Sequence, residues 1–233
     1  MTAWRAALVL VLALAFGASP LWVPDFGGFD PDSFPIPQND PPVQPKGYAF
    51  AIWGLIYLWL IAGSAFGLLK RGTDPAWDAM RLPLALSLAV GAIWLPVAVL
   101  SPVWATILIW AMLLPALVAL FRAPQDDIWT AAWPVGLYAG WLSAASCVAI
   151  GLLLGGYGFL SEDMAALVMI GIAALLAFGV QTRLGRTPTY GIAAIWALIA
   201  ILVQNGVAAS AGLAAAAAAI VLISPTLRAA RGH

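Results

Sequence analysis

The side chains in this sequence that could recognise a ligand are aromatic rather than charged. The chain contains 12 Trp, 9 Phe and 5 Tyr. Phe50, Trp53 and Tyr57 recur three and four residues apart, a spacing that places them on one face of a helix. Rings on several helices that turn toward one cavity would bind a flat, apolar molecule by stacking and burial. Periodicity alone favours the simpler interpretation, in which the rings fill the core of a helix bundle.

Charged side chains are missing from the long apolar runs of the chain. Intramembrane acids and bases mark proton relays and ion paths, so their absence argues against a pump or a proton-coupled carrier. It also argues against an intramembrane hydrolase, which needs an acid, a base or metal ligands. The only histidine is His233, the last residue, and Cys147 lies in an apolar run, where a thiol usually packs. We therefore expect no metal, no cofactor and no enzymatic activity.

The elements that must carry these rings are membrane-spanning helices. The chain is 64% hydrophobic and 9% charged, against about 25% charged residues in soluble domains. The last two apolar runs are separated only by Gln204-Asn205-Gly206, so 188–224 is either two spans or a re-entrant hairpin. The predicted fold is an all-α, polytopic transmembrane bundle of about eight spans, each near the ~20 residues that cross a bilayer. The charge-free runs are 6–23, 47–69, 82–100, 103–121, 130–154, 164–182, 188–204 and 207–224.

The basic residues predict the orientation of these spans. Eight spans place every Lys and Arg except Lys46 on one side, and the positive-inside rule makes that side cytoplasmic, together with both chain ends. We expect an integral protein of a bacterial inner (plasma) membrane, surrounded by lipid. A net charge of zero gives no reason to expect nucleic acid. Residues 1–20 could be a cleaved signal peptide, but the apolar run continues through Leu21-Trp22-Val23, which favours retention.

The segment 24–46 differs from the rest because it is rich in Pro, Gly and Asp, which favour neither helix nor sheet. Loops of this length are often lids or binding elements. Phe26, Phe29 and Phe34 could dock it on the outer end of the bundle. A lid and a solvated tether are equally compatible with the sequence.

Three stretches resemble the tryptophan-rich sensory protein (TspO/MBR) family. The run Pro45-Lys46-Gly47-Tyr48-Ala49-Phe50-Ala51-Ile52-Trp53-Gly54-Leu55-Ile56-Tyr57 is similar to the family signature, in which a Pro-rich loop enters a helix with Trp-x-Phe and then Trp-x-x-x-Tyr. Ile93-Trp94-Leu95-Pro96 and Tyr138-Ala139-Gly140-Trp141-Leu142-Ser143-Ala144-Ala145 follow in the family's order. The resemblance covers about 1–154, the five-helix core of the family, and leaves 155–233 as three additional helices with a short basic tail.

The chain also departs from the family pattern. Gly91 stands where the family usually has Asn, which removes a polar ligand anchor, and Tyr48 replaces the first Trp of the signature. Pro134 lies seven residues before Trp141 rather than four. The stretch 190–196 faintly echoes 48–53.

The resemblance implies binding, transport or sensing of a hydrophobic small molecule such as a tetrapyrrole or a sterol. Two rivals remain open: an assembly subunit with a filled core, and an enzyme acting on a lipid-soluble substrate through Asp126-Asp127 or Glu162-Asp163. The oligomeric state is also open, with a homodimer as one alternative. The predicted pocket residues are Tyr48, Phe50, Trp53, Tyr57, Trp94, Trp110, Tyr138 and Trp141.

Overall fold

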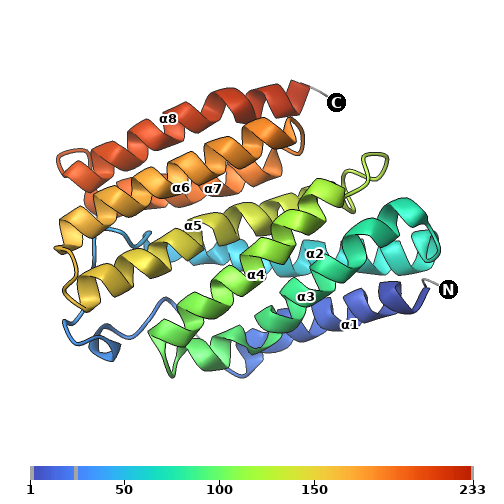
Figure 1. Cartoon of the computed structure of the whole chain (residues 1–233), viewed down its shortest axis with the longest axis horizontal. Helices are drawn as coiled ribbons and strands as arrows, with labels where there is room; N and C mark the ends of the chain where they lie inside the picture. Colours follow the sequence, from blue (N-terminus) through green and yellow to red (C-terminus); the bar gives the residue numbers. More distant parts are fainter. Residues whose placement is uncertain (1–2, 24–25, 232–233) are drawn as a thin grey trace.

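The computed structural model describes residues 3–23 and 26–231, and this part of the chain is helical without strands (Figure 1). Short 3-10 helices η1 (Ser19–Leu21), η2 (Pro31–Ser33) and η3 (Gly47–Ala51) accompany the α-helices. The α-helices are α1 (Ala3–Ala18), α2 (Ile52–Arg71), α3 (Pro75–Ala98), α4 (Pro102–Arg122), α5 (Ala132–Gly156), α6 (Glu162–Leu184), α7 (Thr189–Asn205) and α8 (Ser210–Arg231).

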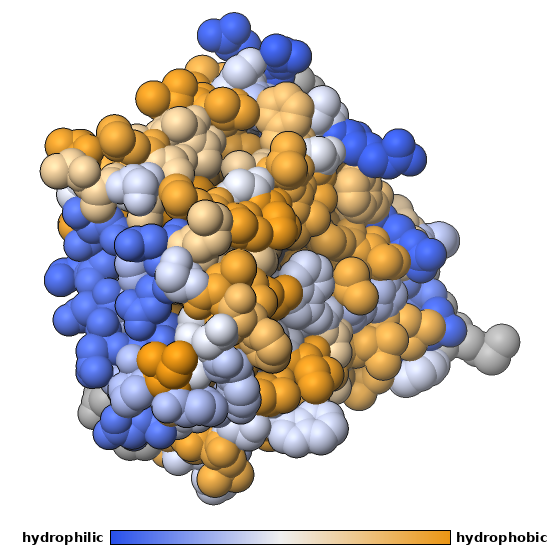
Figure 2. Space-filling view, turned by 60° about the vertical axis from the view of Figure 1, so that its left-hand side comes forward, coloured by the Kyte–Doolittle hydropathy of each residue, from blue (hydrophilic) through white to orange (hydrophobic). Residues whose placement is uncertain are grey.

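Length and composition fit a membrane bundle. Seven helical segments are long and apolar enough to span, where α1 is counted together with η1 (Ala3–Leu21) and α2 together with η3 (Gly47–Arg71), while α7 is apolar but has only 17 residues. At about 1.5 Å per residue α7 still approaches the ~30 Å hydrocarbon thickness. A re-entrant hairpin would need two half-length helices, whereas α8 has 22 residues. Figure 2 shows hydrophobic residues over much of the visible face, with hydrophilic residues gathered toward its edges. The prediction of an all-α, polytopic bundle is confirmed.

The helices alternate in direction, so the two ends of the bundle differ. One end, here called the basic end, carries Lys70, Arg71, Arg122 and Arg183, and both the beginning of α1 and the end of α8 lie there (Figure 1). The opposite end carries residues 26–46 and is called the loop end.

Helix α5 is the centre of the bundle. It contacts α4 and α2 on one side and α6 and α7 on the other (Figure 1). Two glycines of α5 lie against α7: a Cβ on Gly140 would overlap the carbonyl oxygen of Tyr190, and one on Gly136 would meet Thr189. Only glycine allows the two backbones to approach this closely.

Two buried tyrosine–serine pairs fix the position of α5. Ser87 Oγ on α3 donates to the Met112 carbonyl at 2.7 Å, so the Tyr138 hydroxyl donates to Ser87, also at 2.7 Å. On the opposite side, Ser143 and Tyr190 of α7 form the matching pair at 2.9 Å. A hydroxyl without a partner is costly in a bilayer, so these pairs hold α5 against both neighbours.

The basic end is joined by ion pairs. Arg71 Nε lies 2.7 Å from Asp127 Oδ2, and the Trp77 indole donates to the same oxygen at 2.8 Å. Mainly because of the hydrogen bond from Arg71, and secondarily that from Trp77, the pKa of Asp127 lies below its ordinary value. Arg81 is buried and donates to the Arg71 carbonyl at 2.6 Å and to the Gly72 carbonyl at 2.9 Å. Asp127 thus joins α2, α3 and the segment before α5.

Gly140→Val should destabilise the protein, because its Cβ would overlap backbone that cannot move aside. Overpacking costs about 1–3 kcal/mol, and backbone overlap belongs at the upper end. Gly171→Val is the matched control, since nothing lies within 4 Å of a Cβ there. Thermal unfolding in detergent should show a lower Tm for Gly140→Val only. Equal Tm values would contradict the close packing of α5 on α7.

The Asp127 pair predicts a pH-dependent stability. Because the folded pKa is lowered, the pair stabilises the protein above the unfolded pKa of about 3.9, and this contribution is lost as the pH falls through the folded pKa. Asp127→Asn should therefore lower the Tm at about pH 7 and progressively less below about pH 4. Asp126→Asn, a change at the exposed neighbour, is the control. A Tm difference that does not shrink in acid would argue against the ion pair.

Candidate ligand-binding site

The described part of the loop, residues 26–46, is packed onto the loop end of α5. Phe34 and Val43 are buried at 5% and 3% exposure. The Val43 side chain occupies the space where Gly151 lacks a Cβ, and the Phe34 ring does the same at Gly156. The solvated-tether alternative is therefore wrong for these residues.

Hydrogen bonds anchor the same loop to three helices. The Ile36 amide donates to the Gly156 carbonyl at the end of α5 at 2.9 Å. Gln38 donates to Glu162 at the start of α6 at 3.1 Å. At the end of α7, Asn205 donates to the Pro42 carbonyl at 2.9 Å. A loop held at this many points forms a fixed cover over the bundle.

Past the loop, η3 leads the signature segment into α2. Trp196 of α7 donates its indole N–H to the Ala49 carbonyl at 3.1 Å, and its ring packs edge-on against Tyr48 with centroids 5.5 Å apart. Tyr48 is 45% exposed. The stretch 190–196 of α7, which resembles the signature, therefore packs through Trp196 against η3, just before α2 begins.

A first cavity, here called the lateral chamber, lies between the loop end of α1, α2 and α3. Its volume is about 320 Å³, at the lower end of the ~300–1,000 Å³ of small-molecule pockets. Trp53 and Tyr57 stack nearly parallel at 5.5 Å, and the Phe16 ring stands edge-on to both. The lining consists of Phe16, Pro20, Val23, Phe26, Phe50, Trp53, Gly54, Tyr57, Trp94 and Leu95.

A second cavity, the inner chamber, lies between the loop and α5 and has a volume of about 60 Å³. It shares Phe26, Phe50 and Trp94 with the lateral chamber, so these three rings form the wall between the two. Trp94 is fixed in this wall by donating to the Ala105 carbonyl at 2.9 Å. On the α5 side the inner chamber is lined by Trp141, Ala144, Ala145, Val148, Ala149 and Leu152.

A third cavity, the vestibule, opens beside the loop and is polar. Its volume is about 530 Å³, and its lining includes Asp30, Gln38, Asp40 and Gln44. Phe26 lines all three cavities. This loop ring therefore stands between the polar vestibule and the two aromatic chambers.

The structure brings five of the eight predicted rings to the two chambers: Phe50, Trp53, Tyr57, Trp94 and Trp141. Contact of these rings with a ligand stays a prediction. The other three predicted residues are absent from both linings: Tyr48 packs on Trp196, Tyr138 bonds to Ser87, and Trp110 lies half-buried on α4.

Three rings of the chambers lie outside the predicted pocket set: Phe16, Phe26 and Phe29. Phe26 and Phe29 carry a signal in the sequence, because they are aromatic residues in the loop and were expected to dock. Phe16 carries none, because the first apolar run has no motif around it. Phe16 is 2% exposed.

The glycine at position 91 explains where the Phe16 ring lies. A Cβ on Gly91 would lie 2.8 Å from two atoms of that ring and 3.1 Å from Met112 Cε. The position at which the family usually has Asn is therefore filled from α1 by an aromatic ring. In this chain a hydrophobic wall replaces the polar anchor.

The residues lining the two chambers are uncharged. Within residues 3–23 and 26–231, no group of three His, Cys, Asp or Glu side chains could hold a metal ion. The only histidine, His233, lies outside the described residues. The chambers offer stacking surfaces and apolar area for binding.

Comparison with known protein families gives a match over residues 37–227 to the family described as TSPO-like protein. The chain belongs to the TSPO-like protein family. The predicted resemblance is confirmed, and the matched stretch continues past residue 154 into α8. As a TSPO-like chain of apolar helices, it is an integral membrane protein. Neither a curated protein nor a solved structure matches the chain significantly.

Restoring the family's asparagine by Gly91→Asn should destabilise this TSPO-like protein, because the new side chain meets the Phe16 ring. Phe16→Ala alone should cost about 3–5 kcal/mol by leaving a cavity. The double variant should lose less stability than the sum of the two, since the asparagine then has room. A double-mutant cycle of Tm values in detergent measures this coupling. Additive losses would show that Phe16 does not occupy that space.

Proposed function

We propose that this protein binds a hydrophobic, planar small molecule, of the tetrapyrrole or sterol kind, in the lateral and inner chambers and serves its transport or sensing. The observation that carries the proposal is the lateral chamber. It is an uncharged cavity of about 320 Å³ bounded by six aromatic rings from α1, α2, α3, η3 and the loop. Aromatic faces bind flat apolar ligands by stacking, and burial adds about 25 cal/mol per Å².

The size of the ligand follows from the wall between the chambers. A molecule larger than the lateral chamber must extend into the inner chamber past Phe26, Phe50 and Trp94. Trp94 is held by its hydrogen bond to Ala105, and Phe50 belongs to η3. Phe26 belongs to no helix, so it is the ring that moves at least cost.

Binding is favoured over the two rival functions. An assembly subunit should have a filled core, whereas the lateral chamber is empty space among the rings. An enzyme would need a free acid or base, but Asp127 is held by Arg71 and Trp77. Glu162 accepts a hydrogen bond from Gln38 and anchors the loop. These two acids therefore have structural partners.

The proposal also includes the membrane in which the protein lies and its orientation there. We place the basic end in the cytoplasm of a bacterial cell, with the chambers in the opposite half of the inner membrane, because Lys and Arg concentrate at cytoplasmic loops. A homodimer is compatible with this placement.

Protoporphyrin IX should quench the tryptophan fluorescence of the purified protein saturably. Trp53→Leu and Phe50→Leu remove chamber rings and should each weaken binding about tenfold, the equivalent of ~1.4 kcal/mol. Trp104→Leu is the control, because Trp104 is 61% exposed and absent from both chamber linings. If a sterol competes with protoporphyrin IX for binding, the ligand class includes sterols as well.

Since each variant changes the fluorescence itself, the dissociation constants should also be measured by calorimetry. Quenching that never saturates would show that the ligand does not bind in these chambers. Equal dissociation constants for the wild type and all three variants would show the same.

A further inference from the structure

Helix α2 contains three glycines, and packing explains only two of them. A Cβ on Gly63 would overlap the Thr130 carbonyl oxygen, and one on Gly67 would lie 2.5 Å from the Trp77 ring. Nothing lies within 4 Å of a Cβ on Gly54, and this residue is exposed. A helical glycine costs roughly 1 kcal/mol relative to alanine, and no close packing accounts for this one. Yet Gly54 lines the lateral chamber.

Residues that line the chamber and are also partly exposed locate its opening. Besides Gly54, these include Pro20, which follows α1 and lines neither the inner chamber nor the vestibule. The opening therefore lies between the loop end of α1 and the beginning of α2.

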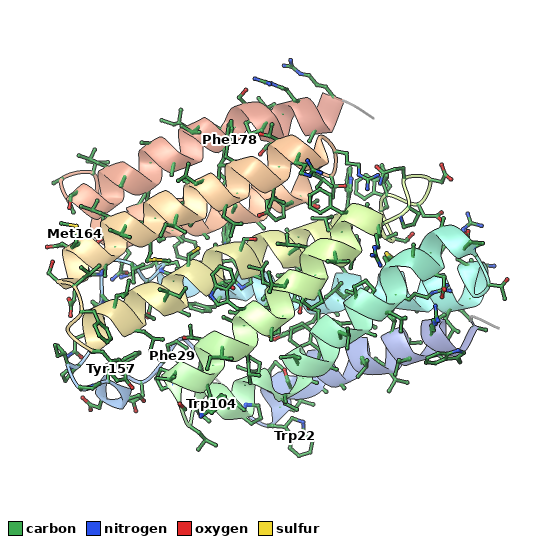
Figure 3. All side chains as sticks on the ribbon, viewed as in Figure 1. Trp22, Phe29, Trp104, Tyr157, Met164 and Phe178 are labelled. Atoms are coloured by element: carbon green, nitrogen blue, oxygen red, sulfur yellow. The ribbon has the colours of Figure 1, made fainter. Side chains whose placement is uncertain are left out.

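The side chains around this opening are apolar and project outward. Leu21 and Trp22 are 83% and 78% exposed, and Leu55 and Leu58 are 53% and 71% exposed. Figure 3 shows Trp22 projecting away from the bundle. Exposed leucines beside an interfacial tryptophan are typical of a surface that meets lipid near the headgroups. The chamber therefore opens toward the bilayer at this point.

We propose that Gly54 keeps a lateral portal open, through which a ligand dissolved in the membrane enters the chamber from the leaflet at the loop end. This inference rests on the proposed function and specifies its ligand as a molecule that partitions into lipid. The competing route is the vestibule, with Asp30 and Asp40 in its lining. An apolar ligand would have to leave the bilayer to use it, at about 25 cal/mol per Å² of apolar surface exposed to water. It would also have to pass Phe26 and Val23, which line both the vestibule and the lateral chamber, whereas Gly54 at the portal lines the same chamber as Trp53 and Tyr57.

The test measures the rate of entry in liposomes. Protein reconstituted with protoporphyrin IX already in the lipid should show a slower quenching rate as position 54 grows from Gly to Ala, Leu and Phe, reaching at least about tenfold for Gly54→Phe. Gly171→Phe is the matched control, because a Cβ there also meets nothing within 4 Å but Gly171 lines none of the three cavities. Gly27→Phe puts the same ring into the vestibule lining, where nothing lies within 4 Å. Both controls should keep the wild-type rate.

The outcomes separate the portal from the binding site itself. A slow Gly27→Phe with an unaffected Gly54 series would overturn the portal in favour of entry from water. Wild-type rates for every variant would overturn it as well. Absence of saturable quenching in the wild type would instead overturn the proposed function. If Gly54→Phe unfolds, as its Tm would show, Gly54→Leu and Gly54→Ala still give the rate series that decides the question.

Discussion

The absence of water in the hydrocarbon of a bilayer shapes how this bundle is assembled, because a buried polar group that lacks a partner inside the protein is costly there. Tyr138 of α5 bonds to Ser87 of α3, and Ser143 of α5 bonds to Tyr190 of α7. These bonds, together with the Gly140 approach to α7, fix the rotation of α5 about its axis. Trp141 lies one turn beyond Tyr138 and is thereby placed beside the inner chamber. The aromatic site depends on hydrogen bonds that lie outside it.

The sequence predicted the helices well because their apolar runs are long and uninterrupted by charge. Within α2 the spacing of Trp53 and Tyr57 correctly placed both rings on one face. Tyr48, named from the family signature, lies in the 3-10 helix of residues 47–51 and packs on Trp196, a partner on α7 that the local pattern does not reveal. The environment of Tyr138 depends on Ser87, a partner 51 residues away that the local pattern does not reveal.

The contacts of the loop could not be predicted from its own sequence. Its Pro, Gly and Asp content disfavours long helices and sheet but does not reveal what the loop contacts. The missing information lies in α5, where Gly151 and Gly156 leave space that Val43 and Phe34 fill. Glycines on a transmembrane helix can receive a neighbouring helix, a loop side chain or nothing, and only the three-dimensional arrangement distinguishes these cases. Gly140, Gly151 and Gly54 represent the three in turn.

The exchange of the family's asparagine for Gly91 changes what the chambers can select. A polar anchor rejects ligands that lack the matching group, because the buried amide would be left unpaired. With the Phe16 ring in that space, the lateral chamber presents stacking faces and apolar walls. A hydrophobic pocket discriminates weakly between ligands that differ in one small group and more strongly by size and flatness. The wall formed by Phe26, Phe50 and Trp94 then limits ligand size, so selectivity among flat, apolar molecules depends on the position of these rings.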